Sequence, residues 1–186
     1  MIRAGFISFF LSAVLAFPIA ATAQACPRPP DIRDQMDVLF SLVQQARNEG
    51  EARPAVNGMW LLWTRAPDAK AQALLDDGRA KIRLGDHEAA AQALSDLVDY
   101  CPDYAEGYNQ RAFANFLQGD YQSALGDLDA ALMRNPRHVA ALSGKFLTLH
   151  ALGRREAAQE SLRAALTLNP WIPERRMLTK PKGTAL

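Results

Sequence analysis

Small and apolar residues recur along this chain at intervals of 34 residues. The turn-forming glycines Gly85, Gly119 and Gly153 are each 34 residues apart. Three more columns keep the same spacing, an alanine, a leucine and a proline: Ala90, Ala124 and Ala158; Leu94, Leu128 and Leu162; Pro102, Pro136 and Pro170. Four columns in phase across three copies indicate an array of structural repeats and not a single globular core.

Each copy is predicted to contain two helices joined by a tight turn. In the middle copy the apolar positions predict one helix over residues 105–118 and a second over residues 121–134, with Gly119 and Asp120 in the turn. The second helix should end before Pro136, because the residue preceding a proline avoids the helical region. The alanines should lie where the two helices cross closely. The pattern therefore predicts an all-α protein.

This 34-residue helix-turn-helix resembles the tetratricopeptide repeat (TPR) family, whose signature is W-x2-L-G-x2-Y…A-x3-F…P. The resemblance implies a solenoid with repeats at residues 71–104, 105–138 and 139–172. The third copy departs from the family pattern, because Phe146 stands where glycine or alanine is preferred. Residues 173–186 are predicted to form a short capping segment and a tail.

A fainter copy precedes the three clear ones. Four of its positions lie 35 residues before their counterparts in the first clear copy: Gly50, Ala55, Met59 and Pro67. They predict a degenerate repeat over residues 32–70, with helices at residues 32–48 and 54–65, and Pro54 would suit the first turn of the second helix. Trp60 and Trp63 fall in that helix. Packing against the next repeat is favoured for them over a ligand site.

The first 23 residues have the order of a secretory signal peptide. Arg3 is followed by an apolar run over residues 6–17, by Pro18 and by small residues that allow cleavage after Ala23 or Ala25. The run is shorter than the ~20 apolar residues of a membrane-spanning helix. We therefore expect an exported chain in a bacterial periplasm, with residues 24–31 as an N-terminal extension and no membrane insertion of the mature protein.

Export changes the interpretation of the two cysteines. In an oxidising compartment Cys26 and Cys101 are expected to pair. In a TPR stack the segment after Cys26 could fold back along the edge where the second helices end, which favours a disulfide with Cys101. The alternative is a lipidated Cys26 that tethers the protein to a membrane, because Ala-Gln-Ala-Cys loosely resembles a lipobox. That motif usually has leucine where this chain has Ala23.

Composition and motifs argue against several functions. The net charge is +1 and no basic run is present, so nucleic acid is not an expected partner. The sequence has no G-x-S-x-G, no H-E-x-x-H, no phosphate-binding glycine loop and no C-x-x-C. The three histidines, His87, His138 and His150, belong to different copies. We therefore predict a non-catalytic protein without cofactor or metal, with an enzyme of unrecognised class as the least favoured reading.

The resemblance implies protein or peptide binding on the concave face, which the first helix of each repeat lines. Projection of the repeat onto that face gives a predicted groove: Arg79, Arg83, Asn109, Gln110, Phe113, Phe116, Leu117, Leu147 and His150. Its apolar members form a strip that the array core does not require. Alternatively, the segment around Trp171 and Ile172 covers this strip.

Two further expectations come from the family resemblance. Arg111 and Asp127 occupy facing slots on the two antiparallel helices of one repeat, which predicts a structural ion pair. One TPR subtype grips the terminal carboxylate of cytosolic chaperones with lysines and asparagines. The corresponding slots here hold Leu75, Arg79, Asn109 and Phe113, so that pattern is absent.

Overall fold

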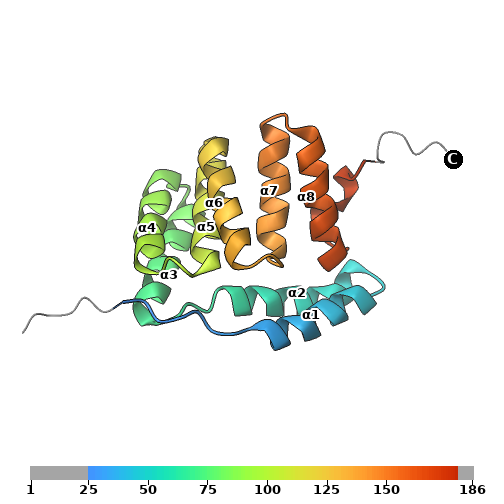
Figure 1. The fold of residues 1–186 in the computed structure, drawn as a ribbon, viewed down its shortest axis with the longest axis horizontal. Coiled ribbons are helices and arrows are strands. Elements are labelled where there is room, and N and C mark those ends of the chain that lie inside the picture. Colours follow the sequence, from blue (N-terminus) through green and yellow to red (C-terminus); the bar gives the residue numbers. More distant parts are fainter. Residues whose placement is uncertain (1–24, 180–186) are drawn as a thin grey trace, which may run out of the picture.

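The structure, a computed structural model, describes residues 25–179. This part of the chain consists of helices joined by short turns. The predicted signal peptide lies outside these residues. The helices are α1 (Arg33–Gln45), α2 (Glu49–Trp63), α3 (Ala69–Leu84), α4 (His87–Tyr100), α5 (Ala105–Leu117), α6 (Tyr121–Arg134), α7 (Val139–Ala151), α8 (Arg155–Leu168) and the 3₁₀ helix η1 (Pro173–Met177). Helices α3 to α8 stand side by side as three antiparallel pairs, and α1 and α2 run across their lower ends (Figure 1). The predicted all-α solenoid is confirmed.

The turn within each pair depends on its glycine. Gly85, Gly119 and Gly153 have φ angles of 79°, 82° and 73°, the left-handed region that side chains with a Cβ avoid. In the first two pairs an aspartate follows directly and caps the next helix. Asp86 accepts a hydrogen bond from Ala89 N and Asp120 accepts one from Ser123 N. One residue thus ends a helix and the next one starts its partner.

Alanines let the helices of a pair approach closely. Ala90, Ala124 and Ala158 are fully buried, one in each pair. At the first crossing even a methyl group is excluded, because a Cβ on Gly78 would lie 2.5 Å from Leu94 Cγ. Phe146 occupies the equivalent position in the third pair and is also fully buried, within a larger cluster that includes residues of α1 and α2. The unusual phenylalanine therefore fills space between the third pair and the helices α1 and α2.

The predicted ion pair is present between α5 and α6. Arg111 donates to Asp127 at 2.6 Å from Nη2 and at 2.9 Å from Nε. These hydrogen bonds raise the pKa of Arg111 above its ordinary value. Asn115 also donates to the carboxylate of Asp127, at 3.2 Å. The pair joins the two helices of the middle repeat through side chains that are mostly buried.

Residues 32–70 form a helix pair, but the predicted register is wrong. Gly50 lies in the first turn of α2 and not in an interhelical turn, and Pro54 lies inside that helix. The helix starts earlier because the side chain of Asn48 caps it. Asn48 accepts a hydrogen bond from Glu51 N at 3.0 Å, and the carboxylate of Glu51 accepts one from Arg47 N at 3.0 Å.

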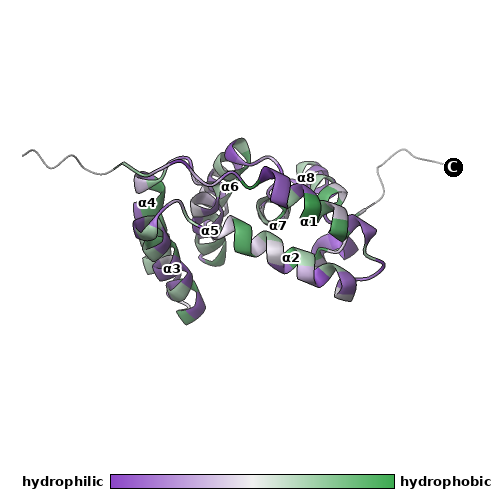
Figure 2. Ribbon diagram, turned by 90° about the horizontal axis from the view of Figure 1, so that it is seen from below, coloured by the Kyte–Doolittle hydropathy of each residue, from purple (hydrophilic) through white to green (hydrophobic). Residues whose placement is uncertain are grey.

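This N-terminal hairpin also does not extend the stack beyond α3. In the view from below, α7 is seen nearly end-on between α1 and α2 (Figure 2). Met36, Phe40 and Val43 share one face of α1, and they are buried in the cluster that contains Phe146 of α7 and Leu162 of α8. Burial of side chains of this size stabilises by about 1.5–3 kcal/mol each. The hairpin therefore uses its apolar stripe to cover the end of the last repeat.

Polar contacts hold the hairpin in this position. The indole nitrogen of Trp171 donates to Val43 O at 3.0 Å, and Gln44 Nε2 donates to Thr167 O at 3.2 Å. Ion pairs join Arg175 to Glu49 at 3.1 Å and Arg137 to Asp37 at 2.6 Å. These contacts fix α1 and the start of α2 to α8, to the segment after α8 and to the loop before α7.

The structure contains the disulfide that the sequence favoured. Cys26 and Cys101 are bonded, with 5.1 Å between their Cα atoms. Cys101 is buried at the end of α4, in a cluster with Leu75, Leu97 and Tyr104. The bond attaches the segment before α1 to the first repeat. Between residues 25 and 179 we find no helix whose length and apolarity would let it span a membrane.

Candidate functional site: the concave groove

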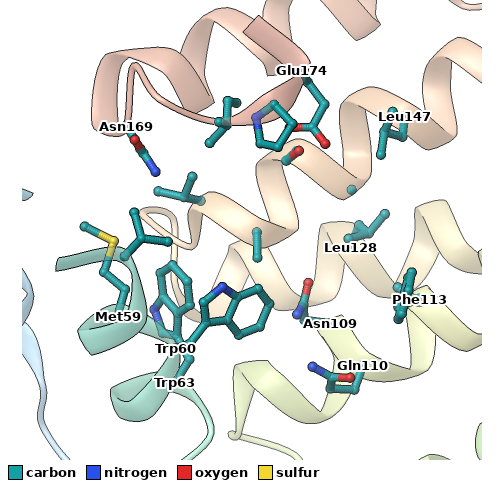
Figure 3. A pocket seen from close by; sticks show the side chains of 18 of the residues that line it. Met59, Trp60, Trp63, Asn109, Gln110, Phe113, Leu128, Leu147, Asn169 and Glu174 are labelled. Carbon is teal, nitrogen blue, oxygen red and sulfur yellow. The ribbon is translucent and has the colours of Figure 1, made fainter. Parts of the chain in front are cut away.

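A cavity of about 750 Å³ opens on the concave side of the solenoid. The first helices of the repeats, α3, α5 and α7, form one side of it, and α2 and the segment after α8 form the other (Figure 3). Helix α2 contributes residues at helical spacing along one of its faces: Glu49, Ala52, Arg53, Val56, Met59, Trp60 and Trp63. The hairpin thus gives the concave face a second wall.

Seven of the nine predicted groove residues line this cavity. They are Arg79, Arg83, Asn109, Gln110, Phe113, Phe116 and Leu147. Leu117 and His150 do not line it. Each lies in the last turn of its helix, and the ring of His150 is 6.0 Å from the ring of Phe146. The structure therefore brings most of the predicted groove together but leaves two of its members outside.

The apolar strip is open, so the C-terminal segment does not cover it. Phe113 retains 47% of its exposed surface. Trp171 and Ile172 instead line the cavity from the side of η1. The structure corrects the alternative that placed these two residues over the strip.

The two tryptophans of α2 have different environments. Trp60 is 38% exposed and lines the cavity. Trp63 is buried and stacks on the ring of His138, with 4.3 Å between the ring centroids. Tyr104 donates a hydrogen bond to Trp63 O at 2.6 Å, and burial raises the pKa of the Tyr104 hydroxyl well above its usual range. Trp63 therefore anchors α2 to the loop between the second and third repeats, and Trp60 presents an aromatic side chain to the groove.

A buried polar cluster lies behind the α5 wall, and the sequence analysis missed it. Glu106 accepts hydrogen bonds from Asn109 Nδ2 at 3.0 Å and from Gln110 Nε2 at 2.5 Å. His138 Nε2 is 2.8 Å from the same carboxylate. Glu106 and His138 are almost fully buried. The spacing of Glu106, Asn109 and Gln110 on one helix face was visible in the sequence, but the partner histidine lies 32 residues further on.

The charges around the groove are unevenly distributed. Arg79 and Arg83 line it from α3, and Arg53 lines it from α2. The carboxylate nearest to Arg79 is Asp76, at 3.9 Å. Of the two glutamates in the lining, Glu49 is paired with Arg175. The α3 side is therefore suited to an acidic group on a ligand. Within residues 25–179, no three histidine, cysteine, aspartate or glutamate side chains are placed to hold a metal ion.

Comparison with known proteins agrees with this fold. The family model described as "Tetratricopeptide repeat" matches residues 115–174. A TPR repeat-containing protein of Rhizobium etli is 30% identical over 139 residues, which is 75% of this chain and 64% of that protein. A tetratricopeptide repeat protein 36 homolog of Nematostella vectensis is 39% identical over 64 residues, which is 34% of this chain and 35% of that protein. The chain thus spans less than two thirds of the length of either relative.

Solved structures with the same architecture have lower identity. The first TPR domain of Spaghetti (RPAP3), bound to an HSP90 peptide, is 23% identical, with a TM-score of 0.57 over 59% of this chain and 88% of that chain. MamA is 21% identical, with a TM-score of 0.53 over 76% of each chain. At these identities the likeness shows the fold alone.

Proposed function

We propose that this chain, a member of the tetratricopeptide repeat family, is a non-catalytic binding module that holds a peptide segment of a partner protein in its concave groove. The observation that carries the proposal is the exposed apolar strip around Phe113, which lies inside a cavity walled by α2, α3, α5 and α7. Exposed aromatic surface in a concave site is typical of a binding surface. Two solved structures of similar fold are complexes with an HSP90 peptide and with pHsp70, which supports peptide binding as the activity.

The groove favours a segment with an apolar side and an acidic group. Phe113, Phe116 and Leu147 would contact the apolar side. Arg79 and Arg83 would attract the acidic group, since both line the same cavity. A segment of this kind on an assembly partner would give the chain a scaffold role.

The bacterial periplasm is the compartment that we propose for this activity. The order of charged, apolar and small residues in the first 23 residues supports export. The disulfide supports an oxidising environment. It also uses the thiol that lipidation of Cys26 would need, and this favours the untethered form over a lipoprotein in envelope assembly.

Peptide binding by groove variants tests the proposal. The probe is a library of acetylated and amidated hexapeptides that carry one aromatic or aliphatic residue and one acidic residue. Phe113→Ala or Phe116→Ala should weaken binding of the best library member by ~2 kcal/mol, the cost of truncating an interface hot spot. Arg79→Glu should weaken it more at low salt than at high salt, because exposed charges are screened.

Gln92→Ala is the matched control, because Gln92 is exposed on α4, outside the groove. It should bind the peptide like the wild type, and circular dichroism should show unchanged helicity in every variant. If the groove variants keep wild-type affinity while Gln92→Ala loses it, the binding surface is elsewhere. If no library member binds the wild type, the groove is not a peptide site.

A further inference from the structure

The two amides on the α5 wall have a fixed orientation. Glu106 offers only oxygen acceptors in its ionised form, so the –NH₂ groups of Asn109 and Gln110 must point towards it. Their carbonyl oxygens are consequently on the side away from Glu106. Both residues line the cavity, and Figure 3 shows both side chains projecting from α5 at its border. Only 7% of the surface of Asn109 and 8% of that of Gln110 is exposed. Within residues 25–179, neither amide oxygen accepts a hydrogen bond from another side chain or from the backbone.

His138 holds Glu106 as an acceptor. The Nδ1 atom of His138 accepts a hydrogen bond from Ala141 N at 3.3 Å, at the start of α7. The proton of the neutral ring is therefore on Nε2, which donates to Glu106 at 2.8 Å. Trp63 stacks on this ring and keeps it in place. Three N–H donors thus converge on one carboxylate, and none of the three groups can turn its N–H away without leaving Glu106 short of a partner.

We propose that Glu106 is a positioning residue that makes the α5 wall an acceptor surface, so that the groove recognises an extended peptide through backbone N–H groups donated to the amide oxygens of Asn109 and Gln110. This inference rests on the proposed function. A helical ligand would not satisfy these oxygens, because a helix uses its backbone N–H groups internally except in its first turn. An extended segment has free N–H groups along its length.

The length of the α2 wall sets the length of an extended ligand. Helix α2 has 15 residues along the wall, a length of about 22 Å at 1.5 Å per residue. An extended strand of the same length has about six or seven residues. The acidic side chain of such a peptide would face Arg79 and Arg83.

N-methylation of the peptide backbone tests the inference. The probe is the best hexapeptide from the library, with each backbone nitrogen methylated in turn, and its affinity for the full exported chain is measured by calorimetry. Methylation at one or two positions should weaken binding about tenfold, because each change removes an N–H donor and leaves a protein oxygen without a partner. Glu106→Gln should reduce that penalty to about twofold, because a glutamine can donate as well as accept and no longer fixes the two amides.

Glu160→Gln is the matched control, because it removes the same charge at an exposed position of α8. It should keep the tenfold penalty. The methylation scan on the wild-type protein remains decisive even if Glu106→Gln does not fold. If peptides bind but no methylated position loses affinity, or if the penalty is unchanged in folded Glu106→Gln, the acceptor role of the wall is wrong while peptide binding stands. If no peptide binds, the proposed function fails as well.

Discussion

Removal of the disulfide should strongly destabilise the protein. The bond between Cys26 and Cys101 spans 75 residues, which include the hairpin and the first repeat. In the chain-entropy model, opening a loop of this length costs about 4.5 kcal/mol at 25 °C. With a urea m-value of about 2 kcal/mol/M, the unfolding midpoint should fall by about 2 M. The loss is this large because the unfolded chain regains the conformational freedom of a 75-residue loop when the bond is absent.

Urea unfolding of the oxidised protein, followed by circular dichroism with and without a reducing agent, measures this effect. The double variant Cys26→Ala/Cys101→Ala should unfold at the lower midpoint, and the reducing agent should not change its midpoint further. Intact-mass analysis of the untreated protein should show the loss of two hydrogens at the cysteines. Coincident curves for oxidised and reduced protein, two free thiols or an acylated Cys26 would refute the reasoning.

Two other predictions concern side-chain contacts of the repeats. The backbone N–H of Ala71 and the hydroxyl of Tyr100 donate hydrogen bonds to Asp68 and lower the pKa of its carboxyl. The ionised carboxylate therefore stabilises the fold above the unfolded pKa of about 3.9. This stabilisation is lost as the pH falls through the lower pKa of the folded state. Urea midpoints should therefore fall more steeply between pH 5 and pH 2 in the wild type than in Asp68→Ala, and parallel profiles would exclude this role. Arg111→Met should cost about 3 kcal/mol in urea unfolding, because it leaves the buried carboxylate of Asp127 without its ion-pair partner. The double variant Arg111→Met/Asp127→Leu should recover much of this loss, and a fully stable single variant would contradict the prediction.

The repeats could be predicted because the residues that shape each helix pair lie within that pair. A glycine that adopts a left-handed φ, an aspartate that caps the next helix and an alanine at the crossing all act within one helix pair. The same signals return every 34 residues, so their agreement across copies identifies them. The Arg111–Asp127 pair was predictable for the same reason, because both residues belong to one repeat.

The N-terminal hairpin was mispredicted where the repeat pattern was extended beyond its signals. Gly50 matches the turn glycines in spacing, but the side chain of Asn48 caps α2 and starts this helix before Gly50. The docking of α1 was not readable from periodicity. Its stripe of Met36, Phe40 and Val43 shows which face is buried but does not identify the surface that covers it. That surface, formed by α7 and α8, is about 100 residues or more away in sequence.

The groove likewise has residues that the repeat pattern predicted and residues that it could not predict. The residues of α3, α5 and α7 follow from the family geometry, and they were found because the first helices of TPR units line the concave face. Leu117 and His150 were misplaced because projection onto a helix face takes no account of where the helix and the cavity end. The wall formed by α2 and the buried Glu106–His138 pair escaped prediction because each depends on contacts between segments that no repeat relates.

These unrepeated parts determine how the groove differs from a generic repeat surface. An open concave face presents side chains from one direction, whereas α2 and the segment after α8 bring a second set of residues to the same cavity. Trp63 couples the two features, because it belongs to α2 and also stacks on the histidine that holds Glu106. A shift of the hairpin would therefore alter both the width of the groove and the orientation of the amides of Asn109 and Gln110. The hairpin therefore contributes to the shape of a groove that is lined mostly by residues of the repeats.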